Sequence, residues 1–564
     1  MKRDPIALIL PLDDRPVTYD YPVYLARSAG YQAQLPKREW LGNPWRPSRH
    51  SLLSAWLAKA AQTADVLIVA IDTLAYGGLI PSRTSSDPLP AILERLALLR
   101  QIKAARPGLS ILASSVIQRV NRGNSSEEEK EYWAIYGARM FRLSYLEHKT
   151  ALNLASAEEA VEGQDLRTQI PAEVYEDYRQ GRQRNHAVNQ AMLDWLAEGV
   201  FDYLILPQDD TADFGWNIAE ARALQARIRR QGLSQRAITY PGADEIGSLL
   251  LAAAICRRTG FHPKVWPRYS SVLSPDVITA YEDRPVHELL KAHLAPLGGS
   301  IAGSADEANL TLFYNAPSHT QGEAYYQWLI WRGLDDLAKE LKTEGYPAML
   351  KQLAGDRHFQ NTRNEMESPL RSPEELVRCL LADLHAGRPA ALADVAYVNG
   401  SDLILGSLLV QHPEIAELSG YGGWNTAGNT LGMVLAQAVI HLAAQFSEIS
   451  RDQIRAHLEF LFMRFIDDYY YQARERTRLM IEDLAELGIQ PGFERLPDEY
   501  LPEIERRVGE HLQVAAAELE RVFIRSGLVS KVQISNIHLP WKRLFEVGFD
   551  VQVDLPETLP TSAY

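Results

Sequence analysis

The chain has 564 residues, a length that predicts one large domain with one or two appendages, and its composition, 46% hydrophobic and 23% charged, is typical of a soluble globular protein. Its formal net charge of −14, without a clustered Lys/Arg surface, disfavours nucleic acid and favours a neutral or cationic ligand. The two cysteines, Cys256 and Cys379, are too few and too distant for a disulfide framework or a zinc site.

The N-terminal segment predicts a first β-strand rather than a signal peptide. The apolar run after Lys2 and Arg3 is short, meets Asp13 and has no small-residue cleavage site. We find no stretch of the roughly 20 apolar residues needed to span a bilayer. We therefore expect a cytoplasmic protein with no membrane partner. The sequence leaves the oligomeric state open, with a homo-oligomer among the alternatives.

Eight runs rich in Val, Ile and Leu predict strands, and most are apolar throughout, as in strands buried on both faces of a parallel sheet. They lie at about residues 6–12, 65–71, 109–117, 202–207, 236–240, 263–269, 308–314 and 393–398. Helical patterns at 52–61, 92–105 and 217–231 follow three of them, which implies right-handed β-α-β units. About eight strands favour an α/β fold closed into a (β/α)8 TIM-like barrel, with an open doubly wound sheet as the alternative.

Two long connections, residues 118–200 and 317–392, are charged and helical, and insertions of this size usually build the rim of a pocket. In the first, we interpret the charged run Glu127–Glu131 as the solvated start of a helix.

The C-terminal part predicts helices over residues 450–525 and a few closing strands over 528–554. We therefore expect a (β/α)8-like catalytic domain over residues 1–450 and a mostly helical C-terminal domain over 451–564, packed on the barrel.

Several predicted strands end in polar clusters, and the carboxyl ends of parallel strands open onto one shared crevice. Asp209 and Asp210 follow the run that ends at 207. One aspartate would suffice to cap the next helix, so two adjacent like charges favour a catalytic pair. Asp244 and Glu245 form a second candidate pair, for which a helix first turn is an equally good explanation.

Residues after other strands complete the expected site, in which carboxylates and amides bind sugar hydroxyls and aromatic rings stack on the sugar. The predicted substrate-binding residues are Asp13, Asp14, Arg15, Asp72, Tyr76, Tyr269, Asn315, Asn399, Asp402, Trp424 and Asn425. We expect Asp13, Asp72, Asp209, Asp244 and Asn399 to face one mouth of the barrel.

Several catalytic motifs are absent from the sequence. No two histidines are spaced i, i+4, and there is neither a phosphate-binding P-loop nor a Gly-x-Ser-x-Gly nucleophile elbow. These absences weaken zinc, nucleotide and serine-hydrolase interpretations. We expect no cofactor and no metal, and an activity that survives EDTA.

Three ordered motifs carry a resemblance that covers nearly the whole chain. Pro11–Val17, Tyr240–Glu245 and Gly423–Thr426 resemble motifs of the bacterial domain-of-unknown-function 4127 family. The family name implies no activity.

Shorter stretches resemble hexosaminidase barrels and β-N-acetylgalactosaminidases. Leu206–Asp210 is similar to the adjacent aspartates of O-GlcNAcase-like enzymes, and Gly242–Glu245 to the Gly-x-Asp-Glu motif of family 20 hexosaminidases. The histidine that precedes the family 20 motif is absent, with Tyr240 nearby, so this second match is weaker.

The resemblance implies a retaining glycoside hydrolase that cleaves β-linked N-acetylhexosamine, with N-acetylgalactosamine as one candidate, by a substrate-assisted mechanism. Asp209 would hold the acetamido N–H and Asp210 would act as acid and base. Asp244 and Glu245 are the alternative pair. The alternative functions are a metal-dependent hydrolase with an Asp-rich site and a non-catalytic sugar-binding protein.

Overall fold

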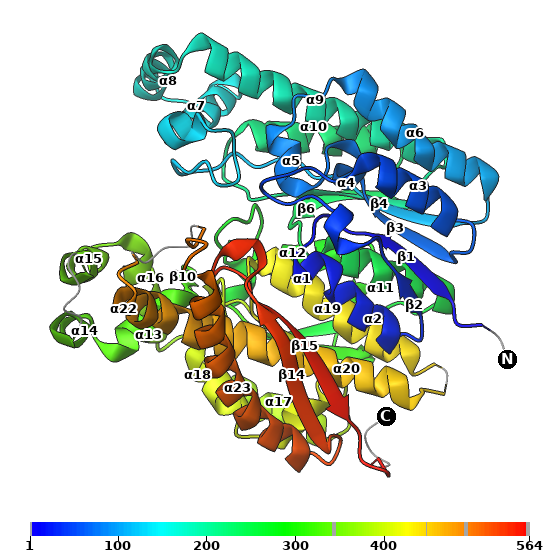
Figure 1. Ribbon diagram of the computed structural model, residues 1–564, viewed down its shortest axis with the longest axis vertical. Coiled ribbons are helices and arrows are strands. Elements are labelled where there is room, and N and C mark those ends of the chain that lie inside the picture. Colours follow the sequence, from blue (N-terminus) through cyan, green and yellow to red (C-terminus); the bar gives the residue numbers. More distant parts are fainter. Residues whose placement is uncertain (1–2, 341–345, 447, 490–494, 560–564) are drawn as a thin grey trace. The chain divides into compact units, whose positions relative to one another are not determined.

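The computed structural model describes residues 3–340, 346–446, 448–489 and 495–559 (Figure 1). The chain divides into two compact units. The first comprises the residues up to Pro22, Tyr31–Ala254 and Tyr281–Asp283, and the second comprises Val23–Gly30, Ile255–Ala280 and the residues from Arg284 onward. This division falls elsewhere than residue 450, so a separate domain over 451–564 stays a prediction.

A six-stranded parallel sheet forms the centre of the first unit, in the order β2-β1-β3-β4-β5-β6. Its strands are β1 (Ile6–Leu10), β2 (Gln32–Gln34), β3 (Val66–Ala70), β4 (Ser110–Ser114), β5 (Tyr203–Gln208) and β6 (Ala237–Pro241). β3 and β5 are buried along their whole length, as their apolar sequences predict. The strand order reverses between β1 and β3, which is the switch point of a doubly wound sheet.

Helices pack on this sheet through an apolar core that includes Leu67, Ile111 and Leu204 of three strands and Leu96 and Leu224 of two helices. Helices of the first unit that connect these strands are α1 (Pro16–Tyr19), α3 (His50–Ala60), α4 (Ile71–Ala75), α5 (Leu79–Thr84), α6 (Leu89–Ala105) and α10 (Trp216–Arg230). Two further helices, α2 (Tyr21–Ser28) and α11 (Ile246–Thr259), are divided between the two units.

The insertion predicted over residues 118–200 is helical and has a small core of its own. It contains α7 (Trp133–Ala151), α8 (Ala157–Gln169) and α9 (Ala172–Ala197). Trp133 of α7 and Tyr178 of α9 pack together, with ring centroids 4.7 Å apart, and Trp216 of α10 joins the cluster.

The second unit contains a five-stranded parallel sheet in the order β13-β11-β9-β7-β8. Its strands are β7 (Lys264–Tyr269), β8 (Ser300–Ile301), β9 (Leu310–Asn315), β11 (Ala390–Asp394) and β13 (Gly420–Gly422). The second unit also contains two further strand pairs: parallel β10 (Gly322–Glu323) with β12 (Tyr397–Val398), and antiparallel β14 (Lys531–His538) with β15 (Gly548–Asp554). The last pair is the set of closing strands predicted over 528–554.

The second unit is otherwise mainly helical, as predicted for residues 317–392 and 450–525. Its helices are α12 (Val286–Leu294), α13 (Ala324–Arg332), α14 (Leu334–Glu340), α15 (Tyr346–Leu353), α16 (Arg357–Met366), α17 (Pro373–His385), α18 (Leu403–Leu409), α19 (Ala427–Ala444), α20 (Arg451–Arg464), α21 (Arg476–Arg478), α22 (Leu484–Glu486) and α23 (Leu501–Arg525). Two π-helical segments, η5 (Phe465–Glu475) and η6 (Leu479–Asp483), follow α20 and α21.

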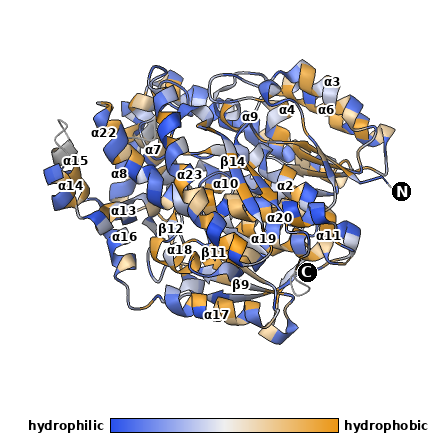
Figure 2. Ribbon diagram, turned by 60° about the horizontal axis from the view of Figure 1, so that its bottom comes forward, coloured by the Kyte–Doolittle hydropathy of each residue, from blue (hydrophilic) through white to orange (hydrophobic). Residues whose placement is uncertain are grey.

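One helix is longer and more apolar than the sequence analysis expected. Ala427–Ala444 has the length and composition of a membrane-spanning segment, contrary to our expectation that no stretch would. However, 89% of its residues are buried inside the protein, as in a core helix, and most of its length is hydrophobic (Figure 2).

The predicted α/β class with parallel strands is confirmed, but the described strands form two separate parallel sheets, so neither the predicted (β/α)8 barrel nor a single doubly wound sheet is shown. Five predicted runs lie in the first sheet, and two more correspond to β7 and β9 of the second. The last run, 393–398, overlaps only the final two residues of β11 and otherwise covers β12. The strand–helix rhythm implies parallel pairing, but closure depends on strand tilt and stagger, which no local pattern reveals. The strands we missed, such as Gln32–Gln34 and Gly420–Gly422, contain no apolar run.

Candidate functional site

Carboxylates gather at the C-terminal edge of the six-stranded sheet. Asp13 follows β1, Asp72 follows β3, Asp209 follows β5, and Asp244 follows β6. Burial is the main cause that raises the pKa values of Asp72, to about 7, and of Asp244, to about 6, and the charge of Asp209 adds to both shifts. These four residues therefore share one electrostatic environment. Asn399, which we expected beside them, belongs to the second unit.

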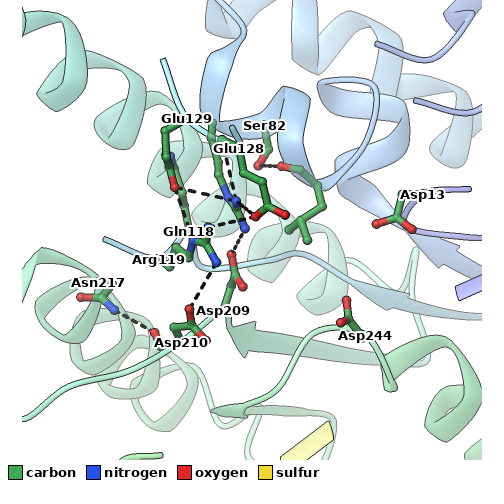
Figure 3. A network of polar contacts seen from close by, with 12 residues as sticks. Asp13, Ser82, Gln118, Arg119, Glu128, Glu129, Asp209, Asp210, Asn217 and Asp244 are labelled. Atoms are coloured by element: carbon green, nitrogen blue, oxygen red, sulfur yellow. Dashed lines mark hydrogen bonds and ion pairs between the residues drawn. The ribbon is translucent and has the colours of Figure 1, made fainter. Parts of the chain in front are cut away.

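Asp209 and Asp210 lie where β5 turns toward α10, and each is held by a different arginine (Figure 3). Arg83 Nη2 donates to Asp209 Oδ2 at 2.6 Å, whereas Arg119 Nη1 is 3.3 Å from Asp210 Oδ2. Asp210 has a φ of 54°, which aspartate tolerates better than most residues, and its carbonyl accepts from Asn217 Nδ2 at 3.0 Å. The turn thus gives the two adjacent carboxylates separate partners.

The two aspartates also differ in exposure. The side chain of Asp209 is 11% exposed and that of Asp210 is 32% exposed. Among the described residues, Oδ1 of each accepts no hydrogen bond. Desolvation by the surrounding protein raises the pKa of Asp210, the charge of Asp209 acts in the same direction, and Arg119 opposes both. Asp210 therefore has the environment of a proton donor, while Asp209 is fixed in an ion pair.

Two glutamates complete this network from the loop before α7. Glu128 Oε2 accepts from both Arg83 Nη1 and Arg119 Nη2, each at 2.9 Å. Glu129 Oε1 lies 3.3 Å from Arg119 Nε and 3.7 Å from Arg83 Nη1. Its side chain is only 1% exposed. Our interpretation of Glu127–Glu131 as a solvated helix start was therefore wrong for Glu129, because the buried Arg83 and the half-buried Arg119 hold this carboxylate inside the protein.

Arg83, Arg119, Glu128 and Glu129 were missed by the sequence analysis. Arg119 could have been found, because it follows β4 and obeys the same strand-end rule as the aspartates. The backbone of Arg119 is held in place by Arg182, whose Nη1 donates to the Arg119 carbonyl at 2.9 Å. The other three come from α5 and a loop, and no signal in the sequence links them to β5.

Arg15 joins the ends of β1 and β6. Its Nε and Nη2 donate to Asp13 at 3.1 and 2.7 Å, and its Nη1 and Nη2 donate to Asp244 at 3.2 and 2.6 Å. All three side chains are buried, and Thr18 Oγ1 also donates to Asp13 at 2.8 Å. The predicted sugar-binding residues Asp13 and Arg15 thus form a carboxylate–guanidinium–carboxylate clamp. The carbonyl of Asp14 accepts from Arg38 Nη1 at 2.6 Å.

The second candidate pair is built differently from the first. Asp244 belongs to the Arg15 clamp, whereas Glu245 is fully buried and folds back against its own turn. A Cβ at Gly242, whose φ is 138°, would lie 2.4 Å from Glu245 Oε1. Burial raises the pKa of Glu245 to about 8, and backbone N–H groups of Ala243 and Glu245 oppose the shift. Glu245 therefore has the environment of a neutral packing group.

Asp72 and Tyr76 lie close to the switch point of the sheet, and both are buried. Asp72 Oδ2 accepts from the backbone N–H of Val116 at 2.9 Å. The guanidinium of Arg184 lies 5.2 Å from the centre of the Tyr76 ring. Burial and the charge of Asp72 raise the pKa of Tyr76.

In the second unit, Asn315 and Asp402 form a closed network at the ends of β9 and β11. Asn315 Nδ2 donates to Asp394 Oδ1 at 2.8 Å and to Asp402 Oδ2 at 3.2 Å. Arg371 pairs with Asp402 and donates to Asn315 Oδ1 at 3.1 Å. Burial and then Asp402 raise the pKa of Asp394 to about 8. Asn315 and Asp402 are completely buried, and their predicted contact with substrate stays a prediction.

The two aromatic residues predicted to stack on a sugar have protein partners within the second unit. Trp424 is 5% exposed, and its ring centroid lies 5.7 Å from that of Phe545. Tyr269 stacks on Tyr314 with centroids 5.6 Å apart.

The remaining predicted contacts, Asn399 and Asn425, have φ values of 66° and 74°. The Asn399 N–H donates to the Asn425 carbonyl at 3.1 Å, and Asn399 Nδ2 donates to Glu323 Oε2 at 3.2 Å. Asn399 directly follows β12 and Asn425 lies shortly before α19, so each occupies a short connection in the left-handed conformation.

A cavity of about 550 Å3 adjoins the acidic network of the first unit. It is lined by Thr84, Glu129, Lys130, Glu131, Tyr132, Glu173, Val174 and Asp177. Glu129 thus belongs both to this wall and to the arginine network. Within the described part of the chain, no group of three or more His, Cys, Asp or Glu side chains is placed to hold a metal ion.

The family model for DUF4127, described as a protein of unknown function, matches residues 7–550. The chain belongs to this family. All three motifs that carried the resemblance, Pro11–Val17, Tyr240–Glu245 and Gly423–Thr426, lie inside the matched range. No curated protein and no solved structure matches the chain. The similarity to hexosaminidases stays a prediction.

Proposed function

We propose that the protein is a glycoside hydrolase in which Asp210 is the general acid and base and Asp209 orients the substrate. The observation that carries this proposal is the difference between the two neighbours. Asp209 is anchored by Arg83 at 2.6 Å, whereas Asp210 is more exposed, has a raised pKa and has a looser contact with Arg119. Two carboxyl groups in different environments can divide acid and anchoring roles between them.

The proposed reaction uses the Oδ1 atoms of Asp209 and Asp210, because the Oδ2 atoms contact Arg83 and Arg119. Asp210 Oδ1 donates a proton to the glycosidic oxygen as the bond to the anomeric carbon breaks, and the resulting carboxylate later activates water. Asp209 Oδ1 accepts the acetamido N–H of a β-linked N-acetylhexosaminide, so that the acetamido oxygen attacks the anomeric carbon and the configuration is retained. N-acetylgalactosamine is one candidate sugar. The roles depend on these side chains and do not require a barrel.

The experiment is a screen with 4-nitrophenyl glycosides, GalNAc and GlcNAc included, followed by Asp210→Asn on any substrate that is turned over. We expect turnover to fall by roughly 10²–10⁴-fold, most for poor leaving groups, because these depend most on protonation. Asp213→Asn, an exposed aspartate on the same loop, is the matched control and should keep wild-type rates.

Three outcomes would contradict the role of Asp210 or the glycoside hydrolase function. An Asp210→Asn variant as active as the wild type removes Asp210 from the reaction. Loss of turnover in EDTA that Mg²⁺ or Ca²⁺ restores favours the metal-dependent hydrolase. Glycoside binding by calorimetry without turnover of any substrate favours the sugar-binding protein.

A further inference from the structure

Arg119, the arginine beside Asp210, is shared among three carboxylates. Its Nη1 lies 3.3 Å from Asp210 Oδ2, its Nη2 lies 2.9 Å from Glu128 Oε2, and its Nε lies 3.3 Å from Glu129 Oε1. Every nitrogen of this guanidinium thus contacts a carboxylate, and the closest contact is made by a residue outside the aspartate pair.

We propose that Glu128 and Glu129 are positioning residues that neutralise Arg119, so that Asp210 keeps the proton it donates in the first step. This inference deepens the proposed function and rests on it. A guanidinium that already pairs with two carboxylates attracts a third less strongly. Burial raises the pKa of Glu129, whereas Arg83 and Arg119 lower it, so the two arginines favour its charged form. The Glu129 side chain is 1% exposed, so this charge acts on Arg119 with little screening.

The other charged groups around Asp210 come from several elements. Asp209 at the end of β5 favours the protonated form, whereas Arg83 on α5 and Arg122 on the loop after β4 disfavour it, as Arg119 does. Three arginines thus lower the pKa of Asp210. Carboxylates that neutralise these arginines are therefore needed to keep Asp210 protonated. Glu128 and Glu129 contact Arg119 directly, so they can change its effect without touching the aspartates.

Glu129→Gln tests this inference because it removes one negative charge and keeps the shape of the side chain. We expect the pKa of Asp210 to fall by about one unit, since the attraction of Arg119 is then less neutralised. The alkaline limb of kcat/KM against pH should move to lower pH by the same amount. Glu129→Asp keeps the charge and should restore the wild-type profile. Glu131→Gln, exposed and two residues further on the same loop, is the matched control.

A readout independent of turnover separates this inference from the proposed function. In protein labelled at the aspartate Cγ with ¹³C, the Asp210 signal is assigned by its absence from Asp210→Asn and titrated with pH. A downward shift in Glu129→Gln supports the inference even if no glycoside is cleaved, in which case only the glycosidase assignment fails. Glu128→Gln is the second variant if Glu129→Gln does not fold. An unchanged pKa of Asp210 in the folded variants overturns the inference.

Discussion

Both sheets carry carboxylates and an arginine at their C-terminal edges, but the two edges differ in access. In the first unit, Asp209 and Asp210 are partly exposed and each keeps one carboxylate oxygen without a hydrogen bond among the described residues. In the second unit, Asp394 and Asp402 are sealed, and both oxygens of Asp394 accept hydrogen bonds. Acidic residues at the end of a strand therefore do not by themselves indicate a catalytic site.

Because the two sheet edges differ in exposure, we expect one to stabilise the fold and the other to bind a ligand. A buried network of paired charges contributes to folding, because removing one member leaves the others unpaired in a dry environment. A partly exposed pair with available oxygens can still meet a ligand. The next experiments test this distinction by asking whether each edge affects stability, turnover or both.

The largest effect is expected from Arg371→Ala in the second unit. The change leaves Asp402 buried without its ion pair and should lower the free energy of unfolding by about 3–5 kcal/mol. Urea denaturation measures this loss. Arg378→Ala, which removes an exposed arginine of α17, should change stability by less than about 0.5 kcal/mol. Because the second edge has no catalytic role in this scheme, kcat/KM per folded molecule should stay at the wild-type value, and a large drop would contradict the distinction.

Asp209→Asn in the first unit should act on turnover. The amide cannot pair with Arg83 as the carboxylate does, so the acetamido group loses its anchor and kcat/KM should fall on the order of 10²-fold. The loss should be equal for good and poor leaving groups, because orientation fails before protonation matters. Rates for a series of aryl N-acetylhexosaminides measure it. A loss that grows as the leaving group worsens would give Asp209 the acid role instead.

Much of the fold could be predicted because burial on both faces of a parallel sheet demands apolar runs. Val66–Ala70 and Tyr203–Gln208 are such runs, and both are strands. Strands without a run, such as Gly420–Gly422, could not be found this way. Nor could the division into two sheets, because the strand that pairs with each edge is decided by long-range packing rather than by local sequence.

The candidate site was predictable only where it follows strands. Asp209 and Asp210 were found because they end an apolar run. Arg83 lies 126 residues from Asp209 in the sequence, and the acids that share it, Glu128 and Glu129, sit in a charged run that resembles a solvated surface. Partners brought together by tertiary structure leave no periodic signal, so the charge balance of the site could not be predicted from the sequence.

The smallest effect is expected from Glu245→Gln. This variant tests whether the buried Glu245 is a neutral structural group although it follows β6 at the same sheet edge as the catalytic candidates. Glu245 lies at the end of β6, beside the catalytic candidates, yet burial raises its pKa to about 8 from an ordinary 4.5. The folded protein therefore holds Glu245 neutral, and this contribution to stability is fully present below pH 4.5 and is lost as the pH rises through 8. Glutamine does not ionise, so relative to the wild type the variant should gain roughly 1–3 kcal/mol between these pH values. Urea denaturation at pH 4.5, 6, 7 and 8.5 measures the trend, with the exposed Glu131→Gln as the control. If the variant instead loses turnover and shows no pH-dependent gain, Glu245 acts as a charged group, and the second pair rather than the first would be the catalytic one.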